Sequence, residues 1–134
     1  MKSLTLLRGL AFAVATLGAA GLAYLSLLPS PFITEVHWIP LGVGIWADHH
    51  GVVRNTVAFF VLGFFVFTFI GRRWPHFLSL CAFSAAIELP QIWLPRRTFD
   101  LQDISAGIEG LAFAWLIVVI PHFVYSRHRA WSRD

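Results

Sequence analysis

The chain has 134 residues, of which 57% are apolar and only 13% are charged, whereas soluble domains have roughly 25% charged residues. The composition excludes an ordinary soluble domain and favours a membrane protein. Its net charge of +3 comes from basic residues beside apolar runs, so it indicates membrane topology and not nucleic-acid binding. A single cysteine, Cys81, excludes an internal disulfide and a cysteine metal cluster.

Long apolar runs predict the transmembrane helices, because about 20 apolar residues cross a bilayer. The predicted spans are residues 7–28, 54–70, 74–94 and 103–125. The second span is short, so Arg54 and Asn55 at its start are expected to lie at or inside the interface, where an arginine can snorkel. We therefore expect an all-α polytopic membrane protein, with residues 1–134 forming one domain, a four-transmembrane-helix bundle.

The first apolar run follows Lys2 and Arg8, which is also the pattern of a secretory signal peptide. It continues to Leu28, beyond the roughly 7 to 15 residues of the apolar region of a typical signal peptide, so an uncleaved first helix is expected. Small residues on one face let membrane helices approach closely. Two such faces, both interpreted as internal packing surfaces, are Ala11, Ala15, Ala19 and Ala23 in the first span and Asp103, Gly107, Gly110 and Ala114 in the last.

Residues 29–53 form the one long predicted loop, which contains WIPLGVGIWADHHG. Its mixture of tryptophans, glycines and a polar end is interpreted as a re-entrant or amphipathic segment at the membrane interface. His37, His49 and His50 are interpreted as solvated loop residues, because adjacent histidines point in different directions on a regular element. No metal and no cofactor are expected.

Cationic residues are distributed unevenly between the two predicted sides. One side has Lys2, Arg8, Arg72, Arg73, Arg127, Arg129 and Arg133, and the other has Arg54, Arg96 and Arg97. Loops rich in Lys and Arg stay in the cytoplasm. We therefore expect both termini to be cytoplasmic.

The stretch IELPQIWLPRRTFDLQD, Ile87 to Asp103, concentrates charge in an otherwise apolar chain. Ser84, Glu88 and Gln91 have i, i+4, i+7 spacing, so they share one face of the third span. Pro90 is expected to bend this helix, because it cannot donate a backbone hydrogen bond. A carboxylate at membrane depth is costly, and it indicates a functional site by default.

The loop after the third span is expected to bring further polar residues to the same outer end, where Asn55 opens the second span. Asp103 has an alternative, purely structural role as a cap of the last helix. The candidate ligand-binding residues are Asn55, Glu88, Gln91, Arg96, Arg97, Asp100 and Asp103. No catalytic residue can be named, and the role of Glu109, deeper in the last span, is left open.

The segments RNTVAFFVLGFF and IELPQIWLPRRTFDLQDISAGIEG resemble the VanZ-like family of small bacterial membrane proteins, between about Val52 and Gly110. The matching positions are Asn55, Phe60, Gly63, Glu88, Gln91, Arg97, Thr98, Asp100, Asp103 and Gly110. Arg96 replaces the usual glycine of the family, and Gly107 stands where an asparagine is often found. The resemblance implies the cytoplasmic membrane of a bacterium and a cell-envelope role. The name member is linked to reduced susceptibility to the glycopeptide teicoplanin, and no reaction is implied.

Three functions fit these residues. The preferred hypothesis is that the outer polar residues bind an anionic lipid or glycolipid headgroup, because arginines recognise phosphate and carboxylate groups. The second is a membrane enzyme on a lipid-linked substrate, with Glu88 as general acid or base and Arg97 stabilising an oxyanion. The third is a small transporter or accessory subunit that uses Glu88 and Glu109, in a homo-oligomer or with a partner protein.

Overall fold

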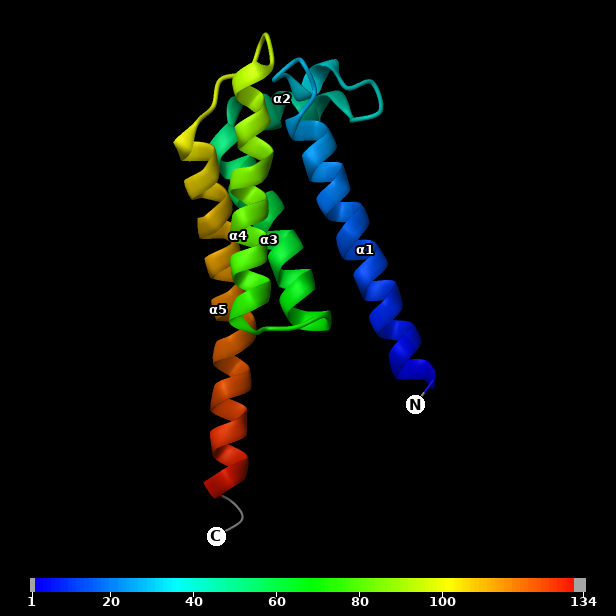
Figure 1. Cartoon of the computed structure of the whole chain (residues 1–134), viewed down its shortest axis with the longest axis vertical. Helices are drawn as coiled ribbons and strands as arrows, with labels where there is room; N and C mark the ends of the chain where they lie inside the picture. The colour runs from blue at the N-terminus through cyan, green and yellow to red at the C-terminus, as the bar shows by residue number, and fades with distance from the viewer. Residues whose placement is uncertain (1, 132–134) are drawn as a thin grey trace.

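The computed structural model describes residues 2–131, with side chains for residues 6–123 and 125, and this part of the chain is helical without any strand (Figure 1). The all-α expectation is therefore confirmed. The α-helices are α1 (Lys2–Ser26), α2 (Leu41–His49), α3 (Gly51–Phe69), α4 (Trp74–Glu88) and α5 (Leu101–Trp131), and two short 3-10 helices are η1 (Ile33–Glu35) and η2 (Leu89–Trp93).

Three helices in the described part are long and apolar enough to cross a membrane, over Leu6–Ser26, Gly51–Phe69 and Leu101–Phe123. The fourth predicted span contains α4, which has 15 residues and does not reach that length. The protein is thus a multi-span membrane protein.

Three helices begin earlier than the apolar runs suggested, and the first of them, α1, begins at Lys2 and not at residue 7. The α3 helix begins at Gly51 and not at residue 54, so Arg54 lies inside its first turn. The α5 helix begins at Leu101 because Asp100 caps it: one carboxylate oxygen of Asp100 accepts the Gln102 N–H at 2.8 Å. The capping role considered for Asp103 therefore belongs to Asp100.

The third predicted span changes its helical form near its outer end. The α4 helix ends at Glu88, and residues Leu89–Trp93 continue as the 3-10 helix η2. Pro90 explains this, since it has no N–H to donate to the carbonyl of Ala86. Ser84, Glu88 and Gln91 are only 1%, 4% and 3% exposed, which confirms that they share an inward face.

The long helices run alternately up and down (Figure 1). The start of α1, the end of α5 and residues 70–73 between α3 and α4 lie at one end of the molecule, which we call the terminal end. The short helices η1 and α2 and residues 94–100 lie at the opposite, loop end. The α1 helix leans away from the other helices toward the terminal end (Figure 1).

Glycines bring α3 and α5 into close contact. A Cβ atom on Gly110 would collide with the carbonyl oxygen of Thr56 and lie 2.9 Å from the Phe60 nitrogen, both in the α3 backbone. On the other side, a Cβ on Gly63 would lie 2.9 Å from Leu111. Ala114 is fully buried at the same contact. The small-residue face predicted for the last span is therefore an internal packing surface.

The alanine face of α1 also points toward the other helices. Ala11 and Ala15 are buried, and Ala19 and Ala23 are partly buried against residues of the helical core. The expected packing surface on α1 is thus confirmed.

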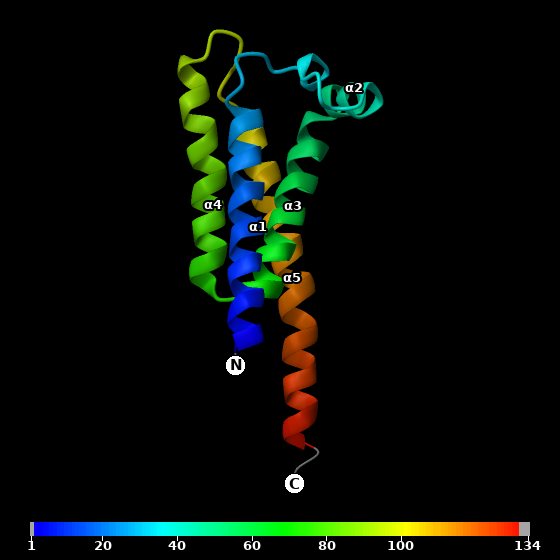
Figure 2. The ribbon, with the colours of Figure 1, turned by 90° about the vertical axis from the view of Figure 1, so that its right-hand side faces the viewer.

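Asp48 fastens α2, which runs crosswise to the long helices at the loop end (Figure 2). Its carboxylate accepts the Ile33 N–H at 2.6 Å, and it accepts the Thr34 N–H at 3.2 Å and the Thr34 hydroxyl at 2.8 Å. Burial acts to raise the pKa of Asp48, but these hydrogen bonds and the Arg54 charge outweigh it and hold the pKa below its ordinary value. The carboxylate therefore ties α2 to η1 in its charged form.

Asp48→Ala is expected to speed hydrogen exchange at the amides of Ile33 and Thr34 by about 5- to 30-fold, the equivalent of about 1–2 kcal/mol of lost hydrogen bonding. Because the folded pKa is lowered, this contribution is complete above the unfolded pKa of about 3.9 and is lost as the pH falls through the folded pKa. Mass spectrometry of exchange across this range measures both effects. Glu35→Gln, on the exposed side of η1, is the control, and equal exchange in the two variants would contradict the assignment.

Candidate functional site

A polar cavity of about 140 Å³ lies at the loop end, between α1, α3, η2 and the start of α5. Its lining residues are Leu22, Leu25, Ser26, Ile33, Arg54, Asn55, Ala58, Glu88, Gln91, Arg97 and Asp103. The cavity thus brings together five of the seven candidate residues, which come from α3, α4, η2, the loop after η2 and α5. Their role as ligand-binding residues stays a prediction.

Glu88 is the most deeply buried charged residue at this cavity, with 4% of its surface exposed. Gln91 forms a side-chain hydrogen bond with it. The second carboxylate oxygen, Oε2, is buried and has no hydrogen-bond partner among the described residues. An unsatisfied buried acceptor costs about 1–3 kcal/mol, and more when it is charged. Glu88 therefore has, next to the cavity, a buried acceptor that no described residue satisfies.

Arg97 contacts α1 and not a carboxylate through its shortest hydrogen bonds. Its Nε–H donates to the carbonyl of Leu28 at 3.1 Å, and its Nη2 donates to the carbonyls of Leu25 and Ser30, each at 3.0 Å. The carbonyl of Leu25 lies in the last turn of α1, where helix carbonyls lack intrahelical partners and favour a positive charge, and the carbonyls of Leu28 and Ser30 lie in the loop that follows. Arg97 therefore joins the loop after η2 to the end of α1.

Burial and the charges around Arg97 shift its pKa in both directions. Burial lowers the pKa of Arg97 from its ordinary value, and the neighbouring Arg54 charge lowers it further. Glu88 and Asp103 act in the opposite direction, and a guanidinium stays protonated in proteins. Since Nη1 has no part in the three carbonyl contacts, it is the group of Arg97 left to interact with an anion.

Asp103 forms the second carboxylate of the cavity. It has a side-chain hydrogen bond with Asn55 and attractive interactions with Arg54 and Arg97. Arg54 was absent from the candidate set, although its position beside Asn55 near the start of α3 was a usable signal. The α1 residues and Ile33 at the cavity had no signal in the sequence, because only the packing of α1 and η1 brings them there.

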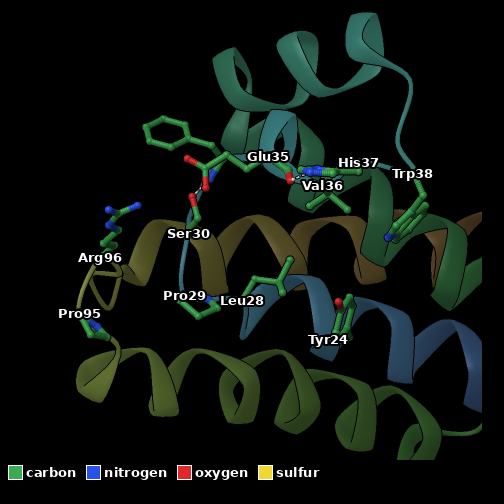
Figure 3. A pocket seen from close by; sticks show the side chains of 11 residues that line it. Tyr24, Leu28, Pro29, Ser30, Glu35, Val36, His37, Trp38, Pro95 and Arg96 are labelled. Atoms are coloured by element: carbon green, nitrogen blue, oxygen red, sulfur yellow. Dashed lines mark hydrogen bonds between the residues drawn. The ribbon is translucent and has the colours of Figure 1, made fainter.

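Two candidate residues do not line the cavity. The carboxylate of Asp100 is used to cap α5. Arg96 instead borders a separate open groove of about 570 Å³ on the other side of the loop end. In Figure 3, Arg96 and Pro95 lie along one edge of this groove, and Tyr24 and Trp38 lie along the other. The arginine doublet is therefore divided between two sites.

Gly107 and Glu109 also lie away from the cavity. Gly107 is buried, and a Cβ there would collide with the Ser84 hydroxyl and lie 3.0 Å from the Phe59 ring. An asparagine at this position, as in the family pattern, would therefore displace both side chains. Glu109 is exposed on the outside of the packed helices. In the described part of the chain, no group of three His, Cys, Asp or Glu side chains is arranged to hold a metal ion.

An apolar groove adjoins the polar cavity. It has a volume of about 390 Å³, runs between α1 and α3, and shares Leu22 and Ala58 with the cavity. Its lining residues are Val14, Ala15, Gly18, Leu22, Ala58, Val61, Leu62 and Phe65. A polar cavity and an apolar groove therefore lie next to each other.

The fold and the site define a helical multi-span membrane protein with a polar cavity at one end of its helices. The chain belongs to the VanZ/LLP1 family, whose pattern matches residues 7–123, and the resemblance found in the sequence is thereby confirmed. No curated protein and no solved structure matches the chain.

Proposed function

We propose that this protein is a single-domain, four-span protein of the bacterial cytoplasmic membrane that binds the headgroup of an anionic lipid or glycolipid. The observation that carries this proposal is the unsatisfied Oε2 of Glu88, at a polar cavity that opens onto an apolar groove. A lipid has the matching chemistry, since its headgroup is polar and its chains are apolar. A lipid partner also suits the cell-envelope setting. We propose in addition that this protein is linked to glycopeptide susceptibility, as the name member of the family is.

The length of α4 and η2 together supports a fourth span. Fifteen residues of α4 at about 1.5 Å each and five residues of η2 at about 2.0 Å each extend roughly 32 Å, compared with about 30 Å for the hydrocarbon core. The short helix therefore reaches across when its 3-10 extension is included.

The distribution of arginines supports cytoplasmic termini. Arg8, Arg72 and Arg73 lie together at the terminal end, whereas the side chains of Lys2, Arg127, Arg129 and Arg133 lie outside the described residues. The cationic bias toward this end favours the cytoplasm. The polar cavity at the loop end then faces outward.

The charges at the cavity favour a headgroup with both donors and acceptors. Arg54 and Nη1 of Arg97 suit a phosphate or carboxylate oxygen, and Glu88 suits a hydroxyl or an amine. A volume of about 140 Å³ corresponds to roughly four or five water molecules at about 30 Å³ each. The cavity therefore accommodates a phosphate or a small amine or hydroxyl group, with the rest of the headgroup outside.

Replacing Glu88 tests this proposal. Glu88→Gln keeps the shape of the side chain but replaces one acceptor by a donor, so lipid retained through purification is expected to fall roughly tenfold. The melting temperature in detergent is expected to stay equal or rise, because an unpaired buried carboxylate is removed. Mass spectrometry of retained lipids measures the first effect, and thermal unfolding measures the second.

Glu109→Gln is the matched control, because it also removes a carboxylate from a membrane helix but on the exposed face of α5. The control is expected to retain lipid as the unchanged protein does. Equal lipid retention in the Glu88 and Glu109 variants would reject the headgroup site.

A further inference from the structure

A second charged cavity lies at the terminal end, remote from the cavity with Glu88. It has a volume of about 590 Å³ and lies between the first half of α1 and the turn from α3 to α4. Its lining residues are Arg8, Phe12, Ile70, Gly71, Arg72, Arg73 and His76. None of these lining residues is acidic, so the cavity differs from the loop-end cavity, where carboxylates balance the arginines.

The turn that supplies two of these arginines is held in place by aromatic contacts. The indole N–H of Trp115 in α5 donates to the carbonyl of Arg72 at 3.1 Å. The Trp115 ring also stacks on Trp74 at a centroid distance of 5.1 Å. The backbone that presents Arg72 and Arg73 is thus held by α5.

His76 supplies a further polar atom without a partner. Its ring lies against Gly71, where an added Cβ would be 2.7 Å from the ring Cε1. The ring Nδ1 is buried and has no hydrogen-bond partner among the described residues. A buried imidazole nitrogen can donate to an anion when it has the proton. Glycine at position 71 allows this close packing, and a larger residue would move the ring.

Three arginines around one cavity repel one another unless an anion lies between them. Phosphate oxygens accept hydrogen bonds from several guanidinium groups at once. The start of α4 adds the positive end of a helix dipole. Arg73, the residue before α4, makes no capping hydrogen bond with its side chain. Phe12 and Ile70 supply apolar surface beside the charges, which suits the beginning of an acyl chain.

We propose that this terminal-end cavity is a separate binding site for a phosphate group, supplied by an anionic phospholipid of the adjacent leaflet or by free phosphate. Arg8 from α1 and the Arg72 and Arg73 pair from the α3–α4 turn hold the phosphate oxygens, and His76 lies beside them. The site does not depend on the headgroup site at the loop end, because the two cavities share no lining residue.

Lipid retention with defined lipids tests the proposal. The full chain is reconstituted in phosphatidylcholine nanodiscs that contain phosphatidylglycerol, is extracted in mild detergent, and is analysed by native mass spectrometry. Arg72→Gln combined with Arg73→Gln is expected to lower phosphatidylglycerol retention by about fivefold for each arginine removed. Phosphatidylcholine retention is expected to stay unchanged. Arg96→Gln, an exposed arginine at the loop end, is the matched control.

Arg72 and Arg73 also contribute to membrane orientation, so Arg8→Gln on α1 provides a second variant with the turn intact, and it is expected to lose about fivefold. Inorganic phosphate distinguishes the two sources of the anion. If phosphate alone binds the unchanged protein and the variants lose that binding, the ligand is free phosphate. If only phosphatidylglycerol binding is lost, the ligand is the lipid. Retention of both ligands by the double variant and by Arg8→Gln at the level of the unchanged protein would overturn the site.

Discussion

Arg97→Ala is expected to lower the stability of the protein in detergent by about 3–5 kcal/mol, the cost of removing one member of a buried charged network. The change removes three hydrogen bonds to the carbonyls of Leu25, Leu28 and Ser30. It also removes a positive charge close to Glu88 and Asp103. Both losses act in the same direction, and thermal unfolding followed by circular dichroism measures their sum.

Two further variants separate the causes of this loss. Arg97→Lys keeps the charge but cannot reproduce the planar fork of donors, so it is expected to restore only part of the stability. Arg96→Ala removes a neighbouring exposed arginine and is expected to change the free energy of unfolding by less than about 0.5 kcal/mol. Similar melting temperatures for Arg97→Ala and Arg96→Ala would show that the contacts with α1 contribute little.

Lipid measurements on the same Arg97 variants test whether Arg97 also contacts a lipid headgroup. If Nη1 contacts a headgroup, Arg97→Lys is expected to lose retained lipid in addition to stability, because a lysine lacks the paired donors of a guanidinium. A large fall in melting temperature with lipid still bound would assign Arg97 only to the connection between the η2–α5 loop and α1.

Gly110→Ala is expected to have the second largest effect, because the added methyl group has no space. It would collide with the Thr56 carbonyl oxygen and approach the Phe60 nitrogen, which belong to the backbone of α3. Backbone cannot rotate away as a side chain can, so α3 and α5 must move apart. Overpacking of this kind costs about 1–3 kcal/mol, and thermal unfolding in detergent measures it.

Gly21→Ala is the matched control for helix propensity. A Cβ on Gly21 has no atom of the described residues within 4 Å, and alanine is a better helix former than glycine by about 1 kcal/mol. The control is therefore expected to be neutral or slightly stabilising. Since Asn55 and Asp103 come from the two helices that Gly110→Ala separates, this variant is also expected to retain less lipid. Equal melting temperatures for the Gly110→Ala and Gly21→Ala proteins would contradict the close contact between α3 and α5.

Local patterns in the sequence were sufficient for the long helices and for part of the candidate site, but not for η1 and α2 in the predicted loop. Apolar runs indicated membrane helices, because the bilayer requires an apolar surface along the whole length of a span. The spacing of Ser84, Glu88 and Gln91 was enough to place them on one face, since helical periodicity is a local property. Their near-complete burial shows that this face points inward.

Contacts between distant segments depended on the tertiary structure. Arg96 and Arg97 are adjacent in sequence, yet one borders an open groove and the other donates to backbone carbonyls in the last turn of α1 and in the loop that follows it. No local pattern separates two neighbouring arginines, because the difference arises from where the end of α1 lies. Similarly, the sequence pattern offered Asp103 as a cap of the last helix, whereas Asp100 caps α5 in the structure.

The cavity itself exists only through helix packing. The close approach of Gly110 to Thr56 sets α3 against α5 and brings Asn55 near Asp103, while α1 supplies one wall. Sequence periodicity reports which face of a helix is apolar, but it contains no information on the distance or angle to a neighbour. Those quantities are set by the shapes of the surfaces that meet. Asn55, Gln91, Arg97 and Asp103 could therefore be proposed from the sequence as neighbours of Glu88, but their arrangement and the α1 wall of the cavity could not.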